Sequence, residues 1–166
     1  MLSRLFPVLS AAILPAISTA QTAAGTDDAA IRAAVRTFED GWNAHNMDAM
    51  FQAFASDVEF VNIVGMHWRG LPDVKRAHQM MHDTTFKTVP NHVEDVQVRQ
   101  LSADAALALV RWKKGAYTPP DGVGRPESRD LMSMFLIKRD GGWLVSAVHN
   151  TPIDEVAARF NPIAQK

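Results

Sequence analysis

The order of two hydrophobic patterns limits what this chain can fold into more than any other feature of the sequence. Ala34, Phe38 and Trp42 recur at helical spacing, and shorter helical patterns follow over 47–56 and 72–82. The second half has the apolar composition of strands, over 92–101, 105–117, 129–138 and 143–150. Helices followed by a run of antiparallel strands are typical of an α+β fold. We therefore predict a curved, mixed or antiparallel sheet that wraps around about three N-terminal helices.

Cap and turn residues indicate where these elements begin and end. Thr26 is suited to cap a helix at its start, and Asn46 is suited to stop that helix. A strand over 58–64 ends at Gly65. Asp140-Gly141-Gly142 predicts a hairpin, because glycine accepts the positive φ of tight turns. We expect one α+β domain over 27–152.

The first 20 residues have the features of an export signal. Arg4 precedes an apolar run over 5–17, and the small residues at 18–20 follow, where a signal peptidase would cut. A membrane anchor is the alternative, but the run is shorter than the roughly 20 apolar residues that span a bilayer. We predict a signal peptide over 1–20, a flexible segment over 21–26, and a C-terminal tail over 153–166, with or without a short helix.

Charge and cysteine content exclude several classes of function. Loss of Arg4 with the signal would leave 16 basic residues from the 17 of the whole chain, against 18 acidic ones. The basic pairs Lys75-Arg76 and Lys113-Lys114 are too small to bind a nucleic-acid backbone. The absence of cysteine rules out disulfides and thiolate chemistry. An exported chain of this kind fits the bacterial periplasm, without stable membrane insertion after signal cleavage.

Two segments place polar side chains inside apolar strand-and-turn units, which is how a pocket is built. FASDVEFVNIVGMHWRG contains Asn62 and Trp68, and GGWLVSAVHNTP ends its apolar run in His149 and Asn150. Together these segments suggest a binding cavity.

Three motifs, in this order of elements, resemble one known superfamily. WNAHNMDAMF at 42–51, DVEFVNIVGMHWRG at 57–70 and GWLVSAVHNT at 142–151 resemble the SnoaL-like branch of the nuclear transport factor two-like superfamily. The resemblance covers 27–152 and implies a cone-shaped, cystatin-like domain. It also implies a homodimer through the outer face of the sheet and a pocket between the concave face and the helices. The superfamily includes ketosteroid isomerases, scytalone dehydratases, limonene epoxide hydrolases, polyketide cyclases and non-catalytic binding modules, so fold does not settle function.

The resemblance also permits a comparison with the catalytic members. Ketosteroid isomerases use a tyrosine and a protonated aspartate to stabilise an enolate, with a second aspartate as base. The single tyrosine here, Tyr117, stands beside a proline-rich loop and matches this pattern poorly. Chemistry of the scytalone dehydratase and SnoaL types would pair a histidine with an aspartate, and the candidates are His82, His149 and Asp130.

His149 and Asn150 point to opposite faces of their strand, so one of them faces the pocket. His149 shares parity with Trp143 and Val145, which predicts that it points inward as a general acid or base. The alternative is a strand-end histidine that bonds to a backbone carbonyl. Asp130 is either solvated at a strand start, as carboxylates commonly are, or faces the cavity as a base with a raised pKa.

His78 and His82 lie one turn apart on the predicted third helix, a spacing that two metal-ligating imidazoles can use. HQMMH lacks the glutamate of a zinc protease helix, and the chain has no cysteine ligands. We therefore predict no metal site, and we predict that His82 lines the cavity.

Large aromatic side chains and methionines would make the walls of a cavity for a flat apolar ligand. Asn62 bonds either to the turn around Gly65 or to the ligand, since a buried amide needs a partner. The predicted ligand-binding residues are Trp42, Phe60, Asn62, Trp68, His82, Trp112 and Met132.

Two classes of function remain open. The first is an exported protein that binds a small hydrophobic molecule. The second is a cofactor-independent isomerase, dehydratase or cyclase in which His149 transfers a proton and Asp130 orients the imidazole. The sequence contains no nucleotide motif, phosphate loop or nucleophile elbow, so we predict no cofactor.

Overall fold

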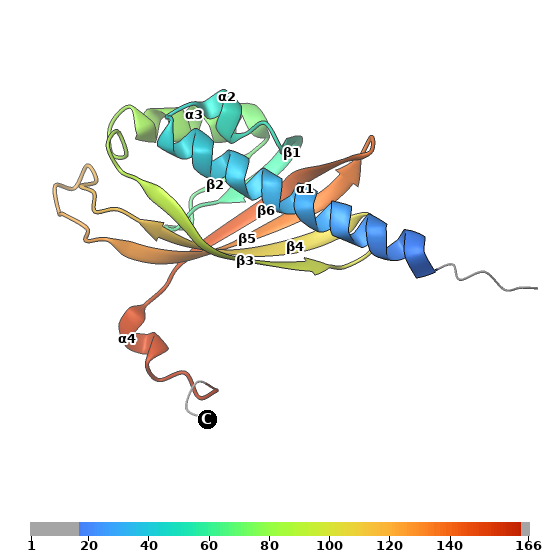
Figure 1. The fold of residues 1–166 in the computed structure, drawn as a ribbon. Helices are drawn as coiled ribbons and strands as arrows, with labels where there is room; N and C mark the ends of the chain where they lie inside the picture. The colour runs from blue at the N-terminus through green and yellow to red at the C-terminus, as the bar shows by residue number, and fades with distance from the viewer. Residues whose placement is uncertain (1–16, 164–166) are drawn as a thin grey trace, which may run out of the picture.

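A six-stranded sheet with helices α1, α2 and α3 on one side forms the body of the protein (Figure 1). The computed structural model describes residues 17–163, with side chains from Asp27 onward. In chain order the elements are α1 (Ile17–Asn43), α2 (Met47–Met50), β1 (Phe54–Val61), β2 (His67–Arg69), α3 (Leu71–His82), β3 (Asn91–Gln100), β4 (Ala105–Lys114), β5 (Ser128–Arg139), β6 (Gly142–Pro152) and α4 (Glu155–Ala158).

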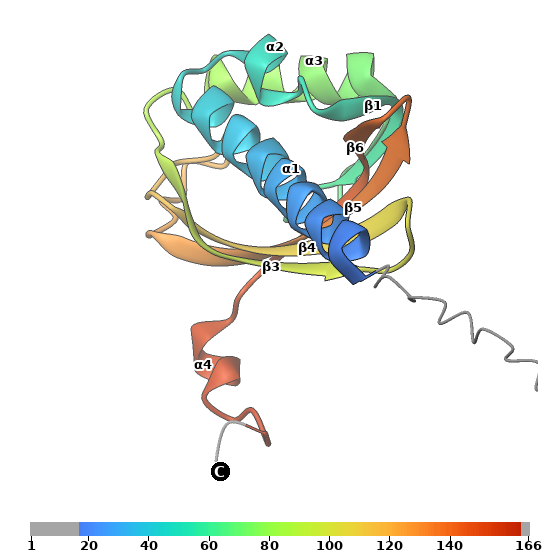
Figure 2. The same ribbon diagram turned by 45° about the vertical axis from the view of Figure 1, so that its right-hand side comes forward.

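The sheet is mixed, and its strand order is β2-β1-β6-β5-β4-β3. The pair of β1 and β6 is parallel, whereas every other pair of neighbouring strands is antiparallel. The long strands curve beneath α1, which crosses the concave face (Figure 2). The predicted α+β fold with a curved mixed sheet and N-terminal helices is confirmed.

Helix α1 buries the stripe that its hydrophobic spacing predicts. Ile31, Val35 and Phe38 are almost completely buried against the sheet. The Phe38 ring stacks on Phe54, with ring centroids 5.7 Å apart. At the C-terminal end of the helix, a Cβ on Gly41 would lie 2.3 Å from the Cα of Met50, so only glycine permits this approach of α1 and α2.

Polar contacts hold α1 in place at Asp27, within the helix, and at Trp42, next to its C-terminal end. The carboxylate of Asp27 accepts hydrogen bonds from Lys138 Nζ and Trp143 Nε1, each at 2.8 Å. The bond from Lys138 is the main cause of the lowered pKa of Asp27. Near Asn43, the Trp42 Nε1 donates to the carbonyl of Val89 at 2.9 Å. The first two bonds join α1 to β5 and β6, and the third joins it to the segment between α3 and β3.

Two predicted turn and cap signals are confirmed. Asp140 and Gly141 both have positive φ, 51° and 79°, in the hairpin that joins β5 to β6. Asn46 follows the end of α1 and caps α2, since its side-chain oxygen accepts a hydrogen bond from the amide of Ala49 at 3.1 Å.

A β-bulge in β6 changes which of its residues face the helices. Leu136 of β5 pairs with Val145, but the preceding Phe135 pairs with Ala147, so Ser146 is an extra residue. Val145 is therefore buried on the concave side, and the next buried position is Val148 rather than 147. The alternation of faces shifts by one residue beyond the bulge.

Several element boundaries differ from the predictions. Helix α1 begins at Ile17 rather than at Thr26, so its backbone is helical across 21–26, which was predicted to be flexible. The second helix ends at Met50 because β1 already begins at Phe54. The short strand β2 was not predicted. Residues 1–16 of the predicted export signal lie outside the described residues.

The chain after β6 leaves the sheet and forms the short helix α4, which projects away from the other elements (Figure 1). Asp154 caps this helix by accepting from the amides of Val156 and Ala157. The alternative of a short helix within the predicted C-terminal tail is thus the one observed. Across residues 17–163, no helix combines the length and the apolar character needed to span a membrane.

Candidate functional site

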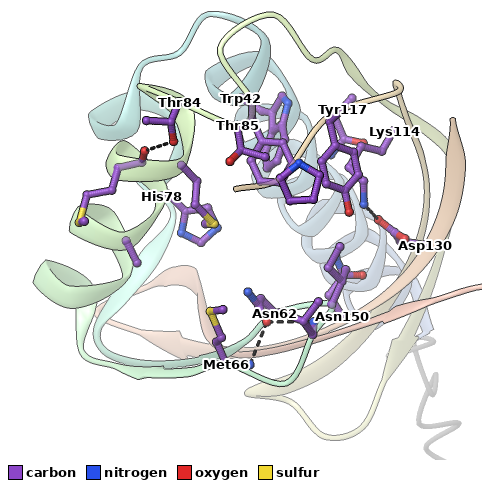
Figure 3. Close-up of a pocket in the computed structure, with 18 of the residues that line it drawn as sticks. Trp42, Asn62, Met66, His78, Thr84, Thr85, Lys114, Tyr117, Asp130 and Asn150 are labelled. Atoms are coloured by element: carbon purple, nitrogen blue, oxygen red, sulfur yellow. Dashed lines mark hydrogen bonds and ion pairs between the residues drawn. The ribbon is translucent and has the colours of Figure 1, made fainter. Parts of the chain in front are cut away.

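A cavity of about 690 Å³ lies between α3, the end of α1 and the concave face of the sheet (Figure 3). Most of its walls are apolar, and its size suits a small organic molecule. Side chains from both halves of the chain line it. The principal lining residues are Phe38, Trp42, Phe60, Asn62, Met66, Trp68, Ala77, His78, Met80, Met81, Thr85, Phe86, Asn91, Lys114, Tyr117, Arg125, Asp130, Met132 and Asn150.

One wall of the cavity is a cluster of rings around His78. The imidazole of His78 lies edge-on to Phe60 and Trp68, with ring centroids 4.8 and 5.3 Å away. Trp42 and Phe86 form a second aromatic contact, at 5.2 Å. These rings offer flat apolar surface to a ligand, and they come from α1, β1, β2 and α3 together with the segment after α3.

The opposite end of the cavity is polar, because charged and amide side chains extend the inward faces of three strands. Lys114 follows Trp112 on the buried face of β4, and Asp130 precedes Met132 on the buried face of β5. Lys114 Nζ donates to Asp130 Oδ2 at 2.8 Å, and both side chains are only 4% exposed. Across the ladder, Met132 pairs with Asn150 of β6. Figure 3 shows this ion pair at the side of the cavity away from α3.

Three buried oxygens at this polar end have no hydrogen-bond partner among the described residues. They are Oδ1 of Asn91, Oδ1 of Asp130 and Oδ1 of Asn150. A buried acceptor without a partner is unfavourable by about 1–3 kcal/mol. Because all three residues line the cavity, a bound molecule with hydrogen-bond donors would relieve this cost.

Tyr117 adds a hydroxyl to the polar end. Its ring lies 5.2 Å from Lys114 Nζ, which is a cation–π distance. Burial raises the pKa of Tyr117, and the nearby negative charge of Asp130 raises it further. Tyr117 therefore stays protonated at neutral pH and can both donate and accept a hydrogen bond.

His78 is neutral in the folded protein. Burial lowers its pKa to about 4, although the bond of Nδ1 to the Val74 carbonyl at 2.8 Å partly opposes this shift. A carbonyl oxygen only accepts, so Nδ1 carries the hydrogen and Nε2 is left as an acceptor. His78 thus contributes an acceptor to the wall opposite Asp130.

The prediction that His82 lines the cavity is wrong. Its side chain is buried behind Trp42, with ring centroids 4.5 Å apart, and its Nδ1 lies 2.8 Å from Nδ1 of His45. Burial, and then the charge of His45, lowers the pKa of His82 to about 4. The two histidines do lie one turn apart on α3, as predicted, but only His78 lines the cavity.

The prediction that His149 faces the cavity is also wrong. The bulge at Ser146 reverses the alternation, so Asn150 lines the cavity and His149 is exposed on the other face. Asp130 lies on the concave face, and the two side chains are therefore on opposite sides of the sheet. Orientation of His149 by Asp130 has no structural basis.

The remaining predicted residues divide into cavity and core. Trp42, Phe60, Trp68 and Met132 line the cavity, as does Asp130, whose buried alternative is the one observed. The placement of Trp112 in the cavity wall is wrong, because Trp112 is not among the residues that line this cavity. Its side chain packs on Phe38, with ring centroids 5.5 Å apart.

Asn62 lines the cavity and also holds the turn after β1 together. Its Oδ1 accepts from the amides of Val64 and Met66, at 3.0 and 2.9 Å. The turn around Gly65 is therefore the partner of this amide, which was one of the two alternatives.

Lys114, Tyr117, Asn91, Asn150 and His78 were not predicted as site residues. For Lys114 the sequence did contain a signal, since it has the same parity as Ala108, Val110 and Trp112 on β4. The equivalent parity argument for Asn150 fails because of the bulge.

Solved structures share this fold. A protein with a cystatin-like fold from Caulobacter vibrioides is 31% identical, over 86% of this chain and 99% of its own, with a TM-score of 0.81. A nuclear transport factor two-like protein from Novosphingobium aromaticivorans is 14% identical over 86% and 93%, with a TM-score of 0.71. A ketosteroid isomerase-like protein from Erwinia carotovora atroseptica is 19% identical over 76% and 95%, with a TM-score of 0.63. The last two show the fold alone.

Sequence comparison narrows the relationship further. None of the curated proteins matches the chain. The family model of the SnoaL-like domain matches residues 35–145, which include the C-terminal part of α1, α2, α3, β1 to β5 and the start of β6. Since this match covers more than half of the sequence, the chain belongs to the SnoaL-like domain family.

Proposed function

We propose that this protein binds a small, largely apolar molecule in the cavity between α3 and the sheet. The observation that carries the proposal is the cavity itself, about 690 Å³ with aromatic walls and a polar end. Ligand sites typically combine a mostly apolar concave surface with a few convergent polar groups. Phe60, Trp68 and His78 form such a wall, and Lys114 and Asp130 lie at the polar end.

Binding is better supported than acid-base catalysis by His149, because that histidine lies on the other face of the sheet. The family includes isomerases and dehydratases, but the isomerase-like relative resembles this chain in fold only.

Blocking the cavity from α3 tests the proposal. Ala77 lines the cavity, so Ala77→Trp would fill part of it with a large ring. We expect naphthalene, as an apolar probe, to bind the wild type and to bind this variant about tenfold more weakly or not at all. Isothermal titration calorimetry measures both affinities.

Gln79→Trp is the matched control, since Gln79 lies on the exposed side of the same helix. This variant should keep the wild-type affinity for naphthalene. The proposal is wrong if the wild type does not bind the probe, or if Ala77→Trp, shown to be folded by circular dichroism, binds it as tightly as Gln79→Trp.

A further inference from the structure

We propose that the cavity selects neutral molecules that carry a hydroxyl or N–H donor on an apolar body, and that the buried Lys114–Asp130 pair recognises this donor. This inference rests on the proposed binding function and adds the chemical class of the ligand. It follows from the charges, the unpartnered acceptors and the position of the pair.

The cations that line the cavity are already neutralised. Lys114 pairs with Asp130 at 2.8 Å, and Arg125 pairs with Asp121 at the rim, at 2.6 Å. An anionic ligand would have to enter the apolar cavity without a free cation among the described lining residues, which is strongly unfavourable. A cationic ligand would meet Lys114 beside Asp130, and the other carboxylate among the described lining residues, Asp121, is paired with Arg125. The charges therefore favour a neutral ligand.

The polar end contains hydrogen-bond acceptors that no donor among the described residues satisfies. Asp130 uses Oδ2 for Lys114, and its Oδ1 has no partner among the described residues. The side-chain oxygens of Asn91 and Asn150 are in the same situation. Carboxylate oxygen accepts and never donates when ionised, so the missing partner is a donor.

The ion pair also fixes the direction of this acceptor. Lys114 ends the buried face of β4 and Asp130 begins that of β5, on adjacent paired strands. Because both side chains are 4% exposed, neither can rotate into solvent without disrupting the packing around the ends of β4 and β5. Met132 follows Asp130 on the same face, so the apolar body of a ligand would lie against Met132 while its donor reaches Asp130.

Three probes with one bicyclic body test the inference. Naphthalene has no polar group, 2-naphthol adds a donor, and 2-naphthoate adds an anion. Titration calorimetry at neutral pH should show that 2-naphthol binds about tenfold or more tightly than naphthalene, since a buried hydrogen bond to a charged group contributes that much. The anion 2-naphthoate should bind more weakly than 2-naphthol by a similar factor.

A double variant, Lys114→Met with Asp130→Leu, makes the polar end apolar while keeping its volume. Replacement of a buried ion pair by apolar groups is often neutral for stability, so this variant should fold. It should lose the preference for 2-naphthol, so that 2-naphthol and naphthalene bind to it with similar affinities. The control removes the exposed pair between Lys113 of β4 and Glu127, which directly precedes β5. This variant, Lys113→Met with Glu127→Leu, should retain that preference.

The outcomes separate this inference from the proposed function. Equal affinities of the wild type for naphthalene and 2-naphthol would overturn the inference and leave the binding function intact. A higher affinity for 2-naphthoate than for 2-naphthol would have the same consequence. An undiminished preference in the double variant would overturn the role of the ion pair. Absence of naphthalene binding to the wild type would instead remove the proposed function. The affinities of the wild type for the three probes can be compared without any variant. The inference can therefore be contradicted even if the double variant does not fold.

Discussion

Replacing Lys114 with methionine is expected to lower the free energy of unfolding by about 3–5 kcal/mol. The Asp130 carboxylate would remain 4% exposed, with no cation at 2.8 Å to balance its charge. Breaking a buried pair from one side is costly for this reason, whereas the intact pair need not add net stability. Urea unfolding followed by circular dichroism measures the difference.

Lys113 directly precedes Lys114 on β4 and provides a control. It pairs with Glu127 at 3.0 Å and is 40% exposed, so Lys113→Met should change stability by about 1 kcal/mol or less. Adding Asp130→Leu to Lys114→Met should recover most of the lost stability, because no unpaired charge remains. Equal effects of the two lysine substitutions would show that Asp130 is not buried as the structure has it.

Stability is expected to fall as the pH drops from about 6.5 to about 4, because two buried histidines resist protonation. His78 and His82 have pKa values of about 4 in the folded protein, against an ordinary value of 6.5. Between these values the unfolded chain binds more protons than the folded one, so the free energy of unfolding decreases with decreasing pH. The decrease attributable to His78 is on the order of 3 kcal/mol. This decrease in stability is absent above about pH 6.5 and complete below about pH 4.

His78→Phe keeps a ring of similar size and cannot be protonated. We expect this variant to lose roughly half as much stability as the wild type between pH 7 and pH 4, since His82 still titrates. His92→Gln is the control, because His92 is an exposed histidine at the start of β3. Denaturant unfolding at several pH values measures the slopes. If the free energy of unfolding depends on pH as steeply in His78→Phe as in the wild type, the His78 imidazole is accessible to protons in the folded wild-type protein.

The order of the elements could be predicted from the sequence because it depends on local patterns. Apolar residues at helical spacing identified α1, and turn residues such as Asp140 and Gly141 fixed the hairpin between β5 and β6. Strand composition likewise located β3 to β6 to within a few residues. The family resemblance, now supported by the match over 35–145, also came from local motifs.

The cavity residues were predictable only where alternation continues along a strand. Asp130 and Met132 follow regular alternation and face inward, as one alternative allowed. His149 was assigned to the wrong face because the extra residue Ser146 depends on pairing with β5, which no local pattern reveals. His78 and His82 differ in exposure to the cavity because of how α3 packs on Trp42, which is a tertiary contact.

Export to the periplasm and formation of a homodimer stay predictions. The first rests on residues that lie mostly outside the described part of the chain. The second rests on the resemblance alone.

Methionine side chains offer the most direct test of the claim that this cavity binds apolar molecules. In a titration with naphthalene, methyl NMR signals report contact at each methionine separately. The cavity-lining methionines are Met66, Met80, Met81 and Met132. The described methionines that do not line it are Met47, Met50 and Met134. We expect saturable shifts for the lining group, largest at the buried Met132, and little change in the others. Shifts confined to Met47, Met50 or Met134, or no saturable shift at Met132, would contradict the account.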